Sequence, residues 1–317
     1  MAVTVSKTIG SAGGRDYSTI QAWEDACPAN LVAVDQVWKG LCYYDTPFGE
    51  QVMIAGITTD TSRYLWLTTG PGQAFCDSPT IRTTNLAFGS SPGVILSRTA
   101  DYETPLTANG PRVLVEGLQI RSTTGGSASV GVVQNGARII FRNCILTGGV
   151  IFTSVDSGID AINCLILSQN LLYRQYTTVN GSLVYCTVVR SSPGGSPGTV
   201  NYSTLDIRNC AFFNFADPIL VSPVLTGGWN CTDLGTAPGA NNQTLKVFAD
   251  QFVNTISDFR AKDTSDLASH GSAYTSAATD DISRTPRGAT PTIGCWELAA
   301  VTEVPAPAAQ PFILFPV

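Results

Sequence analysis

The only near clusters of carboxylates in the body of this chain are Asp156 with Asp160 and Asp101 with Glu103. Cleavage of a glycosidic bond needs two carboxyl groups that face one cleft, about 5–9.5 Å apart. Neither pair has an equivalent on the neighbouring repeat of the chain, so we interpret these residues as solvated surface acids. Asp156 and Asp160 remain the catalytic candidates if the protein cuts sugars.

Other catalytic arrangements have weaker support in the sequence. Arg142 and Arg208 occupy equivalent positions in two repeats, and an arginine base beside calcium-binding acids would suit elimination chemistry. No cluster of acids accompanies them. His270 is the only histidine, and the sequence contains no zinc motif and no glycine-rich nucleotide loop. We therefore expect no cofactor and no metal.

Composition excludes several classes of partner. The net charge is −6, the sequence pI is about 4.7, and no run of basic residues occurs, which argues against a nucleic-acid interface. No apolar run approaches the ~18 residues of a membrane span. The residues from Met1 to Lys7 lack the basic start and apolar core of a signal peptide. We expect a protein that is made in the cytoplasm and either stays there or leaves by lysis or a dedicated route.

A short phrase that recurs down the middle of the chain indicates the fold. It reads apolar–x–apolar–x–Asn–Cys–x–apolar, or a near relative, and its copies are 20 to 26 residues apart. The pivot residues of the copies are Gly117, Asn143, Asn163, Tyr185 and Asn209, with a worn sixth copy at Asn230. Repetition at this period is typical of a solenoid.

The phrase also selects the type of solenoid. Apolar residues alternate at period two on both sides of the pivot, and in most copies the alternation slips by one residue there. A bend in the left-handed conformation, which Asn and Gly tolerate, would keep both flanking strands facing the same core. Tyr185 departs from this rule. Leucine-rich repeats share the period, but return segments such as residues 191–198 are rich in Gly, Ser and Pro and favour turns.

These patterns predict an all-β, single-stranded, right-handed parallel β-helix. The stretch around Gly56 matches the phrase, and the 61 residues from there to Gly117 leave room for roughly three coils. We therefore expect about nine or ten coils between residues 35 and 250.

Four of the nine cysteines follow the pivots of successive repeats. If Cys144, Cys164, Cys186 and Cys210 point inward, they form a row at the spacing of parallel strands, roughly 4.8 Å. Side chains at that spacing are slightly too far apart for an unstrained disulfide. We interpret the row, together with the pivots Asn143, Asn163 and Asn209, as a structural ladder of small buried groups.

The N-terminal residues predict a cap. Ser18 with Gln21 forms a capping box, and Tyr17, Ile20 and Trp23 share one face of a short helix. A solenoid needs its open end covered, because an exposed core and unpaired strand edge invite aggregation. We expect residues 1–34 to form a strand and this capping helix.

Both ends of the chain resemble pectate-lyase-like right-handed β-helix proteins, many of them from phages. The resemblance rests on residues 14–23 (GRDYSTIQAW) and on a closing signature that includes Asp280-Asp281, Arg287 and residues 293–297 (IGCWE). Cys295 replaces the small residue usual in that signature. The resemblance implies a β-helix over residues 35–250 and a closing region over 251–298, whereas its implication for activity is weak, since this architecture hosts enzymes and inert virion parts alike.

The last residues have a different character. Residues 299–317 form a Pro/Ala-rich arm whose tip contains Phe312, Ile313, Leu314 and Phe315. An apolar tip of this kind suits docking on a neighbouring subunit, and docking on its own chain is the alternative.

We expect a non-enzymatic phage virion protein that decorates or cements the capsid. Its expected partners are copies of itself, with a trimer favoured by the resemblance, and the major capsid protein. A tail spike or fibre that binds or cuts host glycan is the first alternative. An extracellular carbohydrate-active enzyme is the second.

Overall fold

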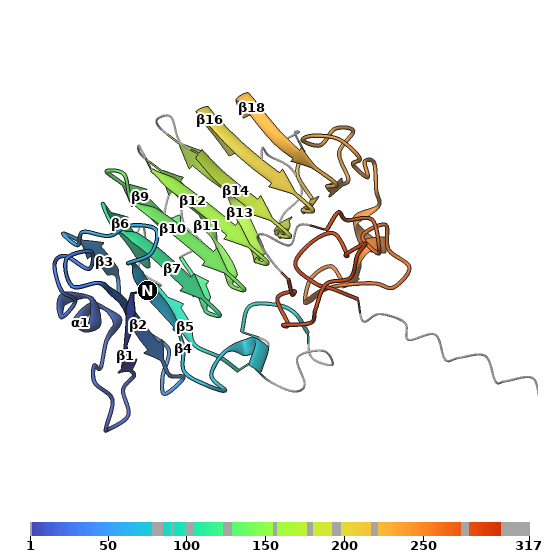
Figure 1. Ribbon diagram of the computed structural model, residues 1–317. Coiled ribbons are helices and arrows are strands. Elements are labelled where there is room, and N and C mark those ends of the chain that lie inside the picture. Colours follow the sequence, from blue (N-terminus) through green and yellow to red (C-terminus); the bar gives the residue numbers. More distant parts are fainter. Residues whose placement is uncertain are drawn as a thin grey trace, which may run out of the picture.

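The computed structural model describes residues 2–77, 85–89, 92–98, 104–122, 129–154, 157–175, 180–191, 198–216, 221–273 and 279–298. It confirms the predicted fold class, a right-handed parallel β-helix (Figure 1). Successive coils contribute strands to three parallel stacks of strands, or sheets, along the solenoid, and the first coils do so only in part. We number these sheets in the order in which a coil visits them.

The first sheet carries the strands that precede the pivots. Among the described residues its strands, in spatial order, are β1 (Val3–Ile9), β2 (Gln36–Cys42), β4 (Leu65–Thr69), β7 (Arg112–Glu116), β10 (Arg138–Arg142), β12 (Gly158–Ile162), β14 (Asn180–Val184), β16 (Gly198–Arg208) and β18 (Val221–Gly228).

The second and third sheets follow the pivots. The second contains β5 (Ile95–Ser97), β8 (Gln119–Arg121), the first halves of β11 (Ile145–Ser154) and β13 (Leu165–Gln175), then β15 (Thr187–Arg190), β17 (Ala211–Phe213) and β19 (Cys231–Thr232). The third contains β3 (Val52–Ala55), β6 (Leu106–Asn109), β9 (Ser129–Gln134), the second halves of β11 and β13, and the starts of β16 and β18.

The corners between the first and second sheets lie at the predicted pivots. Gly117 and Asn143 have φ of 76° and 51°, and Tyr185 takes the same left-handed conformation with φ of 53°. The sixth pivot was predicted one residue too late, because Trp229, with φ of 54°, forms that corner rather than Asn230. The prediction is wrong there because the asparagine, the residue type that favours the bend, lies one position after the corner in this copy of the repeat.

The number of coils is smaller than the predicted nine or ten. Between residues 35 and 250 the described chain contributes eight strands, β2 to β18, to the first sheet. Strand β3 pairs with β6 in the third sheet, so Gly56 marks a different corner, and the strand that follows β4 in the first sheet is β7, which begins only at Arg112. Strands of all three sheets share the period-two pattern, so the sequence does not show which corner follows a strand.

Inward-facing side chains of all three sheets fill the solenoid. A single buried cluster runs from Ile9 to Phe215, and Phe141 stacks on Phe152 with ring centroids 5.7 Å apart. The first end of the cluster is covered by helix α1 (Ile20–Asp25), whose Ile20 and Trp23 are fully buried. Tyr17 packs against the same cluster.

The cap of helix α1 differs in detail from the predicted capping box. Thr19, not Ser18, is the N-cap residue, and its side chain accepts a hydrogen bond from the amide of Ala22. The side chain of Glu50 accepts from the amides of Ile20 and Gln21. The carboxylate of Glu50, distant in sequence, therefore satisfies two free amides of the first turn, including the Gln21 amide that Ser18 was expected to cap.

The C-terminal region packs along the side of the solenoid. Helix α2 (Phe248–Gln251) and the antiparallel strands β20 (Phe252–Asn254) and β21 (Asp258–Ala261) begin it. With the described residues of 262–298 and of the segment between β4 and β7, which contains the 3₁₀ helix η1 (Phe75–Asp77), these elements bury the outer side of the second sheet in a separate apolar cluster. Figure 1 shows the orange and red segments beside the ladder of strands.

Candidate functional site

Asp160 is held rigidly on the outer side of the first sheet. Its carboxylate accepts hydrogen bonds from Nε and Nη2 of Arg138 at 2.6 and 2.7 Å, and from the Ser182 hydroxyl at 2.7 Å. The Asp160 side chain is 7% exposed. This bidentate pairing fixes the carboxylate and neutralises its charge. Asp156, the other predicted candidate, lies outside the described residues.

A second carboxylate lies in the same outward row. The strand register aligns Asp160 with Ser182, then with Asp206, then with Thr226. Two strand spacings of about 4.8 Å separate the two aspartates, so their Cα atoms are roughly 10 Å apart. Asp206 was not among the predicted site residues, because it lies two coils from Asp160 and not on the adjacent coil, although both aspartates stand three residues before a pivot asparagine.

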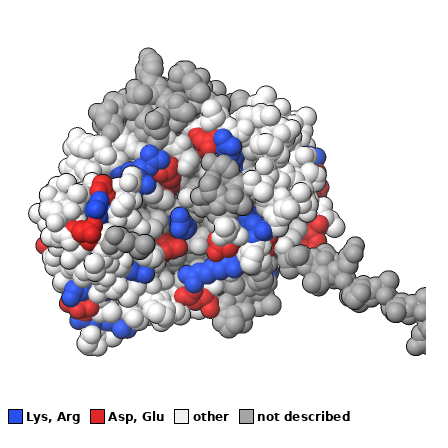
Figure 2. All heavy atoms as spheres, viewed as in Figure 1, with Lys and Arg blue, Asp and Glu red and all other residues white. Residues whose placement is uncertain are grey.

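Asp206 is also paired. Nε of Arg208 donates to both of its carboxylate oxygens at 2.9 Å, and the hydroxyl of Thr226 donates to Oδ1 at 3.0 Å. Figure 2 shows basic and acidic side chains adjacent to one another across the face that carries the first sheet. Asp160 and Asp206 are therefore each paired with an arginine, as is usual for ion pairs on a protein surface.

The four predicted thiols form a buried row behind the corners. Cys144, Cys164, Cys186 and Cys210 are fully buried, and each sulfur lies 3.3–3.6 Å from a backbone carbonyl of the preceding coil. All nine cysteines are free thiols. Burial raises the pKa of Cys164 and Cys210, so the thiol form, which is a poor nucleophile, is retained at neutral pH.

The row ends in a residue that the repeat did not predict. Asn230 follows Cys210 in the row and is fully buried. Its Oδ1 accepts a hydrogen bond from the amide of Cys210, and its Nδ2 donates to the carbonyls of Ile207 and Pro238. Cys231 faces the other way, into the cluster beneath the C-terminal region.

The corner side chains attach the C-terminal region to the solenoid. Nδ2 of Asn209 donates to the carbonyl of Ser272, whose amide donates back to Oδ1, both at 2.8 Å. Nδ2 of Asn163 donates to the carbonyl of Asp280 at 2.7 Å. The hydroxyl of Tyr185 donates to the Ser272 carbonyl at 2.8 Å. The pivots therefore do more than permit a bend.

Arg287 is the central residue of this attachment. Its side chain is 3% exposed and makes an ion pair with Glu297 at 3.1 Å. Its Nη2 donates to Oδ1 of Asn163 at 2.9 Å, and its guanidinium lies 3.8 Å from the ring centroid of Tyr185. It also donates to the carbonyls of Asp280, Thr292 and Gly294. Burial lowers the pKa of Arg287 and raises that of Glu297, because burial disfavours both charges.

The closing residues thus have a structural role within this chain. Asp281 is fully buried and accepts from the amides of Ser283, Thr285 and Glu297. With Arg287 and Glu297 it forms a buried polar network, and each of the three charged side chains has hydrogen-bond partners among the described residues. Such a network specifies one geometry when every member is satisfied.

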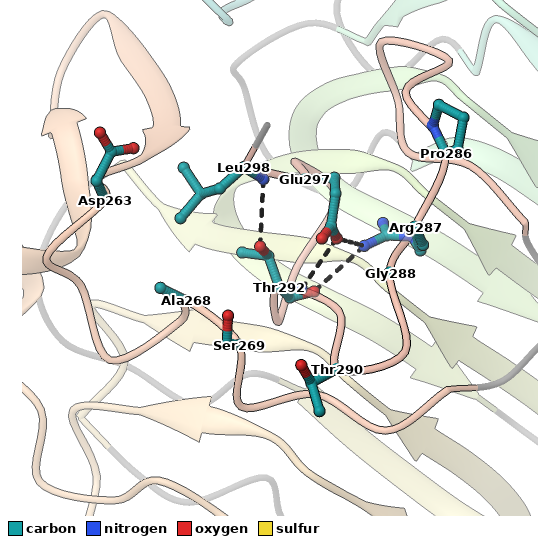
Figure 3. A pocket seen from close by; sticks show the side chains of 10 residues that line it. All are labelled: Asp263, Ala268, Ser269, Pro286, Arg287, Gly288, Thr290, Thr292, Glu297 and Leu298. Carbon is teal, nitrogen blue, oxygen red and sulfur yellow. Dashed lines mark hydrogen bonds and ion pairs between the residues drawn. The ribbon is translucent and has the colours of Figure 1, made fainter. Parts of the chain in front are cut away.

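A hollow of about 490 Å³ lies next to this network (Figure 3). Arg287 and Glu297 form one wall, but their hydrogen bonds turn inward to the protein. Asp263, Ser269 and Leu298 lie on other walls, so Figure 3 shows no convergent set of free polar groups. Leu298 is also the last described residue before the arm.

The remaining sequence expectations concern metal ions, membrane spans, His270 and the apolar tip of the arm. Within the described ranges there is no group of three or more residues suited to hold a metal ion. No helix of that part of the chain is long and apolar enough to cross a bilayer. His270 lies at the surface near Asp266. The docking residues Phe312, Ile313, Leu314 and Phe315 lie outside the described residues.

The fold defines the class of architecture: the chain is a right-handed parallel β-helix. No protein-family model matches it. No curated protein matches it in sequence. Among solved structures it is similar to the pectin methylesterase from carrot, with a TM-score of 0.43 and 12% identity, over 75% of this chain and 82% of that chain. Similarity at this level does not assign an activity.

Proposed function

We propose that the protein is a non-enzymatic structural component of a phage virion, a capsid decoration or cement protein. The observation that carries the proposal is the pairing of Asp160, whose carboxylate is bound by Arg138 and Ser182 and is not poised to act on a substrate. The buried attachment of the C-terminal region supports it, because continuous ladders and a closed side make a rigid particle component.

The arm supplies the proposed means of attachment. Its residues 311–317 are apolar apart from the backbone, and a segment of this composition is a liability in water unless it is docked. We propose that copies of the protein associate, as a trimer, on a surface of the major capsid protein. The place of action would be the virion, after synthesis in the host cytoplasm.

A particle-binding experiment tests this proposal. Undecorated capsids are mixed with the full chain, with a chain lacking residues 304–317, and with a full-length control in which Phe312 and Phe315 are replaced by Ser. The full chain should co-sediment with capsids, and the other two should bind at least tenfold less. Normal binding by the truncated chain would contradict the role of the arm. Failure of the full chain to bind would contradict decoration itself.

A tail spike or fibre that binds or cuts host glycan is the second candidate. The alignment of Asp160 with Asp206 on one outward row favours it, since two acids on a β-helix face could flank a sugar chain. A screen of polysaccharides for cleavage would support it if Asp160→Asn and Asp206→Asn abolish activity while Asp250→Asn, at an exposed site in α2, does not. An extracellular carbohydrate-active enzyme would give the same result without particle binding.

A further inference from the structure

An apolar hollow lies on the side of the molecule, between the second sheet and the β20–β21 hairpin. Its volume is about 220 Å³. Leu167 and Val189 form its floor on β13 and β15, and Phe259 and Ile256 come from the hairpin. Val189 and Phe259 are buried, whereas Ile256 is 86% exposed. The hollow therefore has an apolar floor and an exposed apolar side chain on its rim, and polar residues such as Thr147, Gln169 and Ser191 line the rest of it.

The segment that leads to the rim carries further exposed apolar side chains. Leu245, Val247 and Val253 are 74%, 60% and 51% exposed. With Ile256 they account for four of the nine large hydrophobic side chains that are exposed among the described residues, within a stretch of twelve residues. Clusters of this kind mark docking sites on soluble proteins. We call the hollow and these four residues the side patch.

Arg190 gives the side patch a hydrogen-bond donor. It lines the hollow, and its Nε donates to the carbonyl of Gln169 at 3.1 Å. Its Nη1 is buried and has no hydrogen-bond partner among the residues that the structure describes. A buried donor without an acceptor is costly, so an occupant that brings a carbonyl to this nitrogen would be stabilised.

We propose that the side patch binds the apolar segment from Pro311 to Val317 of a neighbouring copy. The segment offers two phenylalanine rings, of a size suited to a hollow of 220 Å³, together with Ile313 and Leu314. Its two prolines lack N–H groups, so its backbone has more acceptors than donors, which matches the free donor of Arg190. The inference deepens the proposed function by naming the surface that receives the arm.

Linker geometry favours a neighbouring copy over the same chain. Leu298, where the arm starts, packs against the same cluster as Phe259. The guanidinium of Arg260 lies 6.0 Å from the ring centroid of Trp296, so the hollow is near the start of the arm. Residues 299–310 contain two prolines and, if extended, span roughly 37 Å at ~3.1 Å per residue. Such a spacer would have to reverse to reach its own hollow.

Photocrosslinking in the full chain tests the assignment. Phe315 is replaced by benzoylphenylalanine, and the protein is mixed with an equal amount of ¹⁵N-labelled chain at a concentration at which it self-associates. We expect mass spectrometry to find crosslinks between labelled and unlabelled copies at residues 165–191 and 245–259. Ile256→Asp should lower their yield at least tenfold, whereas Val3→Asp, at an exposed site 62% accessible in β1, should not.

Three outcomes would overturn the inference. Crosslinks within one copy only would show that the arm returns to its own chain. Crosslinks elsewhere, or none at all, would show that the side patch is not the receptor. The proposed function is tested separately. Crosslinks at the side patch without binding to capsids would support docking of the arm on a neighbouring copy and would contradict the role in decoration.

Discussion

Replacement of Arg287 by Met is the sharpest test of how the C-terminal region is held. The substitution leaves Glu297 without its cation in a site that is almost fully buried, and it frees Oδ1 of Asn163 and the Gly294 carbonyl from their donor. Removal of one partner from a buried ion pair costs about 3–5 kcal/mol. We expect the free energy of opening of residues 279–297 to fall by about that amount.

The loss should be local. Coils of a solenoid contact mainly their neighbours, so the first sheet can stay folded while the C-terminal region opens. Hydrogen exchange read by mass spectrometry separates the two parts. Peptides from residues 279–297 should exchange roughly 10²–10⁴ times faster, since 1.4 kcal/mol corresponds to a factor of ten. Peptides from β10 and β12 should exchange as in the unmodified protein.

Two further variants make the experiment decisive. Arg287→Lys keeps the charge but not the planar fork, so its effect should be intermediate. Arg63→Met removes a surface arginine that pairs with Asp35 and Asp60, and it should leave the C-terminal region unchanged. If exchange of residues 279–297 in Arg287→Met stayed within threefold of the original, the network would not be what holds this region.

Three other predictions follow from the same structure. Burial raises the folded-state pKa of Asp281, so its contribution to stability is full below the unfolded pKa near 3.8 and is lost as pH rises through the folded pKa. In Asp281→Asn the midpoint of denaturation should therefore depend less on pH across that range. Asn209→Gly should cost about 2 kcal/mol in local opening measured by hydrogen exchange, because two hydrogen bonds to Ser272 disappear, whereas Asn143→Gly should cost less, because the buried Oδ1 of Asn143 has no described partner. Trp229→Asn should leave the thermal midpoint unchanged or raise it, since Asn relieves about 1 kcal/mol of left-handed strain.

The fold was predictable because each copy of the repeat marks its bend with a characteristic residue type. Each coil needs a residue with positive φ between two alternating strands, and Asn143, Asn163 and Asn209 provide it at a regular period. The same logic failed where the special residue is absent or serves another corner. Trp229 bends against its own preference, and Gly56 marks a corner of a different sheet.

The candidate site was only partly predictable, because it depends on register over long sequence distances. Asp160 was found as an outward acid, but its arginine comes from the preceding coil and its aligned acid from two coils later. The position of Asp206, three residues before Asn209, carried that signal. Nothing local in the sequence indicates that Arg287 reaches Asn163, a separation of 124 residues.

The corner asparagines explain how the closing residues of this chain are attached to its repeat. A glycine would make the bend as easily, yet it could not hold another segment, whereas the Asn side chain offers both a donor and an acceptor outside the coil. Asn163 and Asn209 use both groups on the C-terminal region. The choice of Asn at these corners therefore couples the solenoid to its side cover. A chain that kept the coils but lost residues 271–297 should tolerate glycine at both positions with little further loss of stability.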